Sequence, residues 1–320
     1  MSKLIWQRQL EEWVSTYQTF SSKGQVATYI PALAHADSEA LGISVIGADG
    51  TILQVGQIDT AFTMQSVSKV VNFIAACETR GLSTILENVD VEPTGDSFDS
   101  MIRLEMHKPG KPFNPMINAG AITVASMLPG KTHQQKFNQF LDTMERFIGR
   151  RPTINVAVYQ SERDTAHRNR AITHYLKGSG FLDSEVEDAL EVYLKECSVE
   201  VTTVDLAKIG LLLAHDGFHP QIGERLISKK TAQVTKSLMM TCGMYNASGK
   251  MAAFIGVPSK SGVSGGIVAS VARRKVTADL PFAEGCGIGI FGPSIDEYGN
   301  SVAGVALLQK MSEEWDLSVF

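Results

Sequence analysis

The sequence predicts an α+β fold in which an antiparallel β-sheet is built from both ends of the chain and a long helical region lies between them. Two observations lead to this prediction. Strand-like runs separated by turns occur before residue 63 and again after residue 250, whereas residues from about 80 to 250 have mainly helical patterns. If strands from both ends of the chain form one sheet, the two ends must meet in space, and the helices between them must pack against the sheet.

The first predicted element is an amphipathic helix within residues 1–20. This stretch has neither the uninterrupted apolar segment nor the small-residue cleavage site of a signal peptide, and no run elsewhere approaches the roughly 18 apolar residues of a membrane span. We therefore expect a cytoplasmic protein that makes no membrane contact. The apolar residues that repeat at helical spacing are Trp6, Leu10, Trp13, Val14 and Tyr17.

A β-hairpin is predicted next, because the runs LGISVIG (41–47) and TILQVGQ (51–57) flank a turn that contains Asp49-Gly50. The pattern then becomes helical over 63–77, so a strand leads into a helix near residue 63. Further helices are expected at 119–128, 134–148, 161–176, 184–196, 202–214 and 229–239.

The last part of the chain returns to strands. Three are predicted, MAAFIGV (251–257), GGIVASVAR (265–273) and GCGIGIFG (285–292), followed by a turn at 296–300 and a closing helix over 301–311. No linker or charge block divides the chain. We therefore expect one domain over 1–320, with a sheet-containing part formed by about 1–65 and 250–320 and a mainly helical part over about 66–249.

Composition excludes several classes of function. The 320 residues carry a formal net charge of -5, which is unlike the basic face that nucleic-acid binding needs, so small molecules are the expected partners. The four cysteines are far apart and the pair His215 and His219 straddles a glycine, so neither set predicts a metal site. The glycines of GCGIGIFG lack dinucleotide-binding spacing and are interpreted as close packing.

The strongest local signal is Ser66-Val67-Ser68-Lys69 at the start of a predicted helix. Spacing of three places the serine and the lysine on one helix face, where a lysine that desolvation keeps neutral can take the proton of the hydroxyl. The N–H groups and dipole at a helix N-terminus suit an oxyanion. By itself the motif also fits a capping serine followed by a solvated lysine.

A second motif, Lys260-Ser261-Gly262, precedes the strand GGIVASVAR and adds a cation, a hydroxyl and a position of close backbone approach. The two motifs together are typical of the serine acyl-transferases that include β-lactamases and penicillin-binding proteins.

Over nearly its whole length the sequence resembles the serine-dependent glutaminases. The resemblance implies a β-lactamase/transpeptidase-like fold, hydrolysis of L-glutamine to L-glutamate and ammonia, no metal or organic cofactor, and a homo-oligomer, either a dimer or a tetramer. The ordered blocks that carry it are YIPAL (29–33), QSVSK (65–69), NPMINAGAI (114–122), QSERD and RNRAI (160–172), YLKECSVEVT (193–202), CGMYNASG (242–249) and KSGVSGGI (260–267).

The resemblance also implies the site. Ser66 would be the nucleophile, Lys69 its base, and the backbone N–H groups of Ser66 and Val263 the oxyanion hole. We further assign Tyr245 to proton relay, because ammonia must leave protonated. The residues implied to line the glutamine pocket are Tyr29, Ser66, Asn118, Glu162, Asn169, Tyr193, Tyr245 and Val263. Within that set, Glu162 suits the substrate ammonium, and Asn118, Asn169 and Tyr29 suit its carboxylate.

Other interpretations stay open at this point. Ser161-x-x-Asp164 resembles a capping box, so Glu162 could simply favour a helix start; on one helix, Glu162 and Asn169 would lie about 10 Å apart. A lone tyrosine is most often a half-buried aromatic with a satisfied hydroxyl. Among whole-protein alternatives, a β-lactamase or peptidoglycan hydrolase should carry an export signal, and a non-catalytic amino-acid sensor would not need an intact Ser66 and Lys69 pair.

Overall fold

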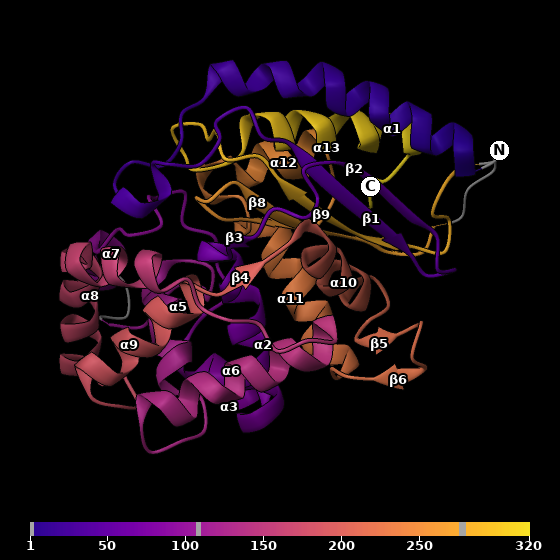
Figure 1. Cartoon of the computed structure of the whole chain (residues 1–320). Coiled ribbons are helices and arrows are strands. Elements are labelled where there is room, and N and C mark those ends of the chain that lie inside the picture. Colours follow the sequence, from indigo (N-terminus) through magenta and orange to yellow (C-terminus); the bar gives the residue numbers. More distant parts are fainter. Residues whose placement is uncertain (1–2, 107–109, 275–279) are drawn as a thin grey trace.

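The computed structural model describes residues 3–106, 110–274 and 280–320. A layer of helices and a sheet occupies one side of the molecule, and a helical region occupies the other (Figure 1). The sheet has five antiparallel strands in the order β2-β1-β9-β8-β7. Their bounds are β1 Gly42–Gly47, β2 Ile52–Gly56, β7 Ser259–Ser261, β8 Gly266–Val271 and β9 Cys286–Phe291. The predicted α+β class and the sheet built from both chain ends are confirmed.

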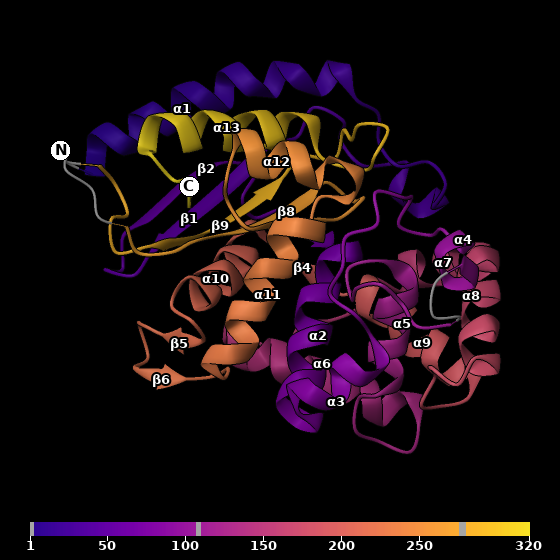
Figure 2. The same ribbon diagram turned by 180° about the vertical axis from the view of Figure 1, so that it is seen from behind.

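Helices from opposite ends of the chain cover one face of this sheet. They are α1 (Lys3–Gln18), α13 (Val302–Trp315) and the shorter α12 (Ser248–Phe254), and Figure 2 shows α1 and α13 lying side by side over the strands. A single apolar cluster joins them to the sheet, and the rings of Trp13 and Trp315 meet within it at 5.2 Å. The amphipathic first helix, the hairpin and the closing helix are therefore where the sequence predicts them.

The opposite face is covered by α10 (Thr203–Ala214), which packs unusually close to the central strand β9. A Cβ on Gly287 would lie 1.9 Å from the carbonyl oxygen of Ala207, and one on Gly289 would lie 1.9 Å from that of Thr203. A side chain at either glycine would collide with the helix backbone. The glycines of GCGIGIFG thus serve close packing, as predicted.

The helical region follows the predicted order, with two small two-stranded sheets added. Its helices are α2 Ser68–Arg80, α3 Leu82–Asn88, α4 Ile102–Met106, α5 Asn118–Ser126, α6 His133–Ile148, α7 Val156–Thr165, α8 His167–Gly178, α9 Val186–Cys197 and α11 Lys229–Cys242. Short 3-10 helices lie at Thr19–Lys23, Pro31–Leu33, Gln65–Val67 and Tyr245–Ala247. The two small sheets pair β3 Phe62–Thr63 with β4 Glu200–Val201, and β5 Phe218–His219 with β6 Glu224–Arg225.

Two predictions of elements are wrong. The single helix over 161–176 is two helices, because α7 begins earlier, at Val156, and the chain turns at Ala166 before α8. The run 251–257 is not a strand but overlaps α12. Met251 and Ile255 are buried while Phe254 is exposed, which is the four-residue period of a helix lying on a core. The strand in that part of the sheet is β7, formed by the Lys260-Ser261 motif itself.

A buried lysine closes the end of α5. Lys136 is 4% exposed, and its Nζ donates to the carbonyl oxygens of Ser126 at 2.6 Å and Leu128 at 2.7 Å. Replacing Lys136 with methionine should lower the free energy of unfolding by about 2–3 kcal/mol, because two buried carbonyls lose their donor. Urea unfolding checks this, with the exposed Lys131→Met as the control that should change stability by less than about 0.5 kcal/mol. Equal effects of the two substitutions would contradict the capping role.

Candidate active site

Ser66 lies where the chain passes from β3 into α2, in a tight 3-10 turn. The preceding residue, Gln65, has a φ of 48°, a left-handed conformation that costs a non-glycine residue about 1 kcal/mol or more. Strain of this kind persists where the surrounding structure fixes the backbone. Here it places the Ser66 side chain, which is 8% exposed, at the wall of a pocket.

The turn between β7 and β8 packs directly on this segment. A Cβ on Gly262 would lie 2.6 Å from the carbonyl oxygen of Met64, so only glycine permits the approach. Ser264 Oγ then donates to the carbonyl oxygen of Thr63 at 2.6 Å. Neither the Ser66 N–H nor the Val263 N–H donates a hydrogen bond to another described residue. Both groups are therefore free to receive an oxyanion.

Lys69 follows one helical turn later and is 1% exposed. Its Nζ donates to Asn118 Oδ1 at 2.6 Å and lies 5.9 Å from the ring centroids of Phe98 and Tyr193. Burial lowers the pKa of Lys69 to about 8, with nearby acidic groups opposing that shift. Near neutral pH this lysine therefore reaches the neutral state that a base requires far more readily than an exposed lysine does.

A second buried lysine, Lys260, lies against the ring of Tyr245. Lys260 Nζ donates to the Ser261 carbonyl oxygen at 2.6 Å and lies 4.4 Å from the centroid of the Tyr245 ring. Burial lowers the pKa of Lys260, and Lys69 lowers it further. Tyr245 has a φ of 52°. Its buried hydroxyl makes no hydrogen bond of normal geometry to the described residues, although burial raises its pKa and the neighbouring Ser66 hydroxyl opposes that rise.

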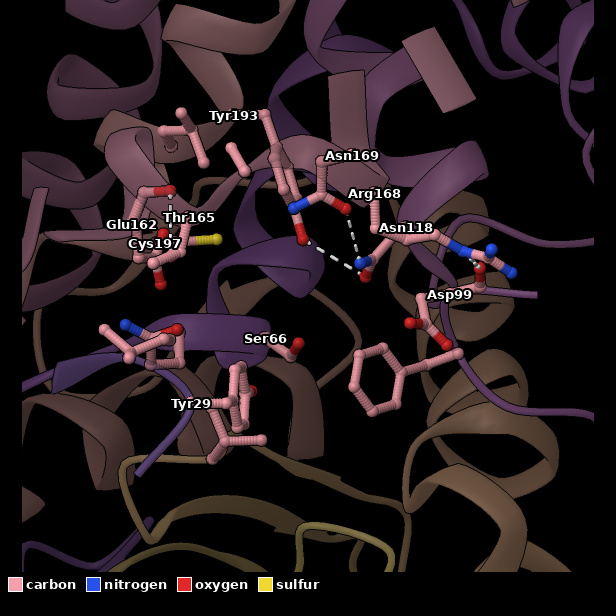
Figure 3. A pocket seen from close by; sticks show the side chains of 16 residues that line it. Tyr29, Ser66, Asp99, Asn118, Glu162, Thr165, Arg168, Asn169, Tyr193 and Cys197 are labelled. Atoms are coloured by element: carbon pink, nitrogen blue, oxygen red, sulfur yellow. Dashed lines mark hydrogen bonds between the residues drawn. The ribbon is translucent and has the colours of Figure 1, made fainter. Parts of the chain in front are cut away.

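Ser66 and Val263 border a pocket of about 450 Å³ (Figure 3). Of the nine residues predicted from the sequence, seven line it: Tyr29, Ser66, Asn118, Glu162, Asn169, Tyr193 and Val263. Lys69 lies behind Asn118, and Tyr245 borders a neighbouring cavity on the other side of Phe98. The structure thus brings the predicted residues together from α2, α5, α7, α8, α9, two 3-10 helices and two loops.

Asn118 is the centre of the polar network in this pocket. Its Oδ1 accepts hydrogen bonds from Lys69 and from the Tyr193 hydroxyl, the latter at 3.1 Å, and its Nδ2 donates to Asn169 Oδ1 at 2.8 Å. Figure 3 shows Asn118, Asn169 and Tyr193 converging on one point. The amide oxygen of Asn118 is therefore committed to orienting Lys69 and Tyr193, and only its second N–H is available to a ligand.

Glu162 is a buried carboxyl group in this pocket, 7% exposed. Burial raises its pKa to about 7, while hydrogen bonding by the Gln65 side chain and the charge of Lys69 oppose the rise. The alternative that Glu162 favours a helix start is wrong, since α7 begins six residues earlier and Asn155 caps it by accepting from the Val158 N–H at 3.0 Å. Asn169 lies on the next helix.

Several lining residues were not predicted: Ile30, Gln65, Phe98, Asp99, Thr165, Ala166, Arg168, Leu194 and Cys197. Five of them lie inside four of the blocks that carry the family resemblance, so position alone could have indicated them: Ile30, Gln65, Arg168, Leu194 and Cys197. Phe98 and Asp99 lie in a loop without a motif, and nothing in the sequence indicates that Arg168 Nε donates to the carbonyl oxygen of Asp99 at 3.0 Å. No group of three or more potential metal ligands occurs among the described residues.

Comparisons with known proteins give a consistent result. Residues 24–320 match the family described as glutaminase. The chain is 59% identical to glutaminase 2 of Bacillus anthracis, with 97% of this chain and 95% of that protein covered, and 58% identical to glutaminase 1 of Bacillus subtilis strain 168, with 98% and 95% covered.

Solved structures agree with these sequence matches. The crystal structure of a probable glutaminase from Bacillus subtilis has a TM-score of 0.91 at 56% identity, covering 98% of this chain and 97% of the other. A covalent complex between a Bacillus subtilis glutaminase and 5-oxo-L-norleucine has a TM-score of 0.89 at 53% identity, covering 98% and 99%. None of the helices in the described ranges combines the length and apolar character needed to cross a bilayer.

Proposed function

The chain belongs to the glutaminase family, and on this basis we propose that it hydrolyses the side-chain amide of L-glutamine to L-glutamate and ammonia through an ester on Ser66. The observation that carries the serine mechanism is that Ser66, on the wall of the pocket, is followed one helical turn later by Lys69, a fully buried lysine of lowered pKa. Such a pair supplies a nucleophile and a neutral base without any metal ion.

The proposed reaction begins when neutral Lys69 takes the proton of the Ser66 hydroxyl. The Ser66 oxygen attacks the side-chain carbonyl carbon of glutamine, and the oxyanion that forms accepts hydrogen bonds from the N–H groups of Ser66 and Val263. The carbon–nitrogen bond then breaks as Tyr245 delivers a proton to the nitrogen, and ammonia leaves. Water attacks the resulting ester and releases glutamate, with the proton returning through the same groups.

Substrate positioning follows from the charges in the pocket. The Glu162 carboxylate pairs with the substrate ammonium, and donors from Asn169, Tyr29 and the free N–H of Asn118 suit the carboxylate. Tyr193 contributes through its bond to Asn118. A polar pocket of this kind fixes the amino-acid end of glutamine, so that the side-chain amide reaches Ser66.

Labelling with 6-diazo-5-oxo-L-norleucine tests the nucleophile, because a Bacillus subtilis glutaminase forms a covalent complex by reaction with this glutamine analogue. Mass spectrometry of the digested protein should place the adduct on the peptide that contains Ser66. Cys197 also lines the pocket, although burial raises the pKa of its thiol and opposes formation of the thiolate. An adduct on Cys197 instead would overturn the serine mechanism.

The pH dependence of kcat/KM should rise with pH between about 6 and 9. Two groups act in the same direction: Glu162, whose pKa is about 7, must be ionised to bind the ammonium, and Lys69, whose pKa is about 8, must be neutral to act as the base. In Glu162→Gln the ionisation near pH 7 should disappear and KM should rise about tenfold or more. A kcat/KM that falls as the pH rises from 7 to 8 would contradict these assignments.

We also propose that residues 1–320 form one cooperative unit and that the protein is a cytoplasmic homo-oligomer. Support for a single unit comes from the sheet, whose strands β1 and β9 are paired although they come from opposite ends of the chain. The assembly and the location are carried over from the resemblance to the family, and light scattering of the purified protein distinguishes a dimer or tetramer from a monomer.

A further inference from the structure

An open groove of about 560 Å³ continues from the active-site pocket. We call it the outer groove; residues 23–29 form one wall, residues 295–299 form the other, and Phe98 and Val263 complete it. Three residues line both the pocket and the outer groove, namely Tyr29, Phe98 and Val263. The pocket and the outer groove therefore meet at Val263, whose N–H group is assigned to the oxyanion.

Both walls of the outer groove are fixed by hydrogen bonds. Gln25 and Ile295 pair across it as an antiparallel bridge, with N···O distances of 3.0 and 2.9 Å. The Asp296 carboxylate accepts from the N–H groups of Tyr298 at 3.0 Å and Asn300 at 2.9 Å, which holds the 296–300 turn closed. The outer groove is thus a formed feature of the fold and needs no rearrangement to receive a ligand.

The 296–300 turn lies against the groups assigned to the leaving nitrogen. A Cβ on Gly299 would lie 3.0 Å from the Val263 side chain and 3.2 Å from the Tyr245 ring. Ser261 Oγ also donates to the Gly299 carbonyl oxygen at 3.4 Å. The proton donor for the departing amine is therefore adjacent to one wall of the outer groove.

The direction of the substrate follows from these positions. The leaving nitrogen must face Tyr245, which is assigned to protonate it, and a Cβ on Gly299 shows that the Tyr245 ring lies against one wall of the outer groove. A glutamine whose amide carbon lies at Ser66 therefore points its side-chain nitrogen towards Tyr245 and Val263, at the edge of the outer groove. Glutamine has only hydrogens on that nitrogen, but a substituent on it would extend into the outer groove.

We propose that the outer groove is a leaving-group subsite, through which the enzyme hydrolyses γ-glutamyl amides whose nitrogen carries a short cationic substituent. This inference rests on the proposed glutaminase function. Ser66 forms an ester with the γ-glutamyl group, the carbon–nitrogen bond breaks, the substituted amine departs with the proton from Tyr245, and water releases glutamate. The preference for a cation comes from two carboxylates on one wall, those of Asp296 and the exposed Glu297, which outnumber the single cation on the other wall, Lys23.

Three substrates test the proposal: L-glutamine, N5-propyl-L-glutamine and N5-(2-aminoethyl)-L-glutamine, all assayed by glutamate release. We expect turnover of all three, with kcat/KM for the aminoethyl compound about two- to fivefold above that for the propyl compound at low salt. This advantage should vanish in Glu297→Gln and in about 1 M salt, where exposed charges are screened. Hydrolysis of glutamine without hydrolysis of either substituted amide would overturn the proposal and leave the glutaminase function intact.

A variant that fills the outer groove gives the second test. Gln25 is exposed on the wall, and Gln25→Trp should lower kcat/KM for both substituted amides about tenfold or more while that for glutamine changes less than about twofold. Gln309→Trp, at an exposed position of α13, is the matched control and should affect none of the three. Substituted amides that are hydrolysed equally well by Gln25→Trp would overturn the assignment to this groove, whereas no glutamate from glutamine itself would refute the proposed function.

Discussion

Ser66→Ala should lower kcat for glutamine by about four to six orders of magnitude, which is the size of effect seen when the nucleophile of a covalent mechanism is removed. The alanine methyl group cannot form the ester, and water in the pocket has no equivalent position under the N–H groups of Ser66 and Val263. The substitution removes one oxygen from a site that tolerates a small side chain, so the fold and substrate binding should persist. Ammonia release in single-turnover and steady-state assays measures the loss.

Ser270→Ala provides a matched control for this substitution. Ser270 is also buried, at 1% exposure in β8, and its hydroxyl has no hydrogen-bond partner among the described residues. Removing that hydroxyl should leave kcat unchanged and should not destabilise the protein, since no partner loses its bond. If Ser66→Ala retained more than about a hundredth of the activity while isothermal titration still showed glutamine binding, another nucleophile would have to be sought.

The local spacing of apolar residues and the turn residues predicted most of the fold, because most helices and strands of this protein follow that spacing. The apolar spacing of the first helix, the Asp-Gly turn and the alternation in the last strands each reflect direct packing against the sheet, so periodicity and burial agree. The Ser-x-x-Lys spacing predicted a shared helix face for the same reason. These signals are local, and they survive without knowledge of the rest of the chain.

The wrong predictions come from segments in which contacts with distant parts of the chain determine the type and the bounds of the element. The run MAAFIGV has the composition of a strand, yet α12 forms there because Met251 and Ile255 face the core while Phe254 lies at the surface. The early start of α7 at Val156 is set by the Asn155 cap, which lies upstream of the pattern that suggested a helix. Neither feature can be recognised from a window of a few residues.

The same distinction applies to the site. Residue types predicted which groups suit a bound amino acid, but not that Asn118 uses its amide oxygen to hold Lys69 and Tyr193. That network joins α2, α5, α8 and α9, and its most distant members, Lys69 and Tyr193, are 124 residues apart in the chain, so no spacing rule contains it. The outer groove is likewise made by two chain ends that meet only in the folded protein.

Lys69→Arg should lower kcat by about three to four orders of magnitude even though the positive charge is kept. The guanidinium group does not lose its proton at accessible pH, so it cannot act as the base for Ser66, whereas burial brings the pKa of Lys69 to about 8. Lys69→Met should be as inactive, but the methionine should not reduce stability greatly, because it removes the cost of holding a cation in a fully buried position.

Lys136→Arg is the control that separates two effects of replacing a buried lysine with arginine: the loss of a removable proton and the burial of a larger guanidinium group. Lys136 is also buried, but it caps α5 away from the pocket, so its arginine variant should lose stability while keeping the kcat of each folded molecule. Active-site titration with 6-diazo-5-oxo-L-norleucine alongside thermal unfolding gives both quantities. The mechanism requires a neutral amine at position 69. If Lys69→Arg kept more than about a tenth of the wild-type kcat, another group would have to be the base. Lys260, which lies beside Tyr245, would be the first to examine.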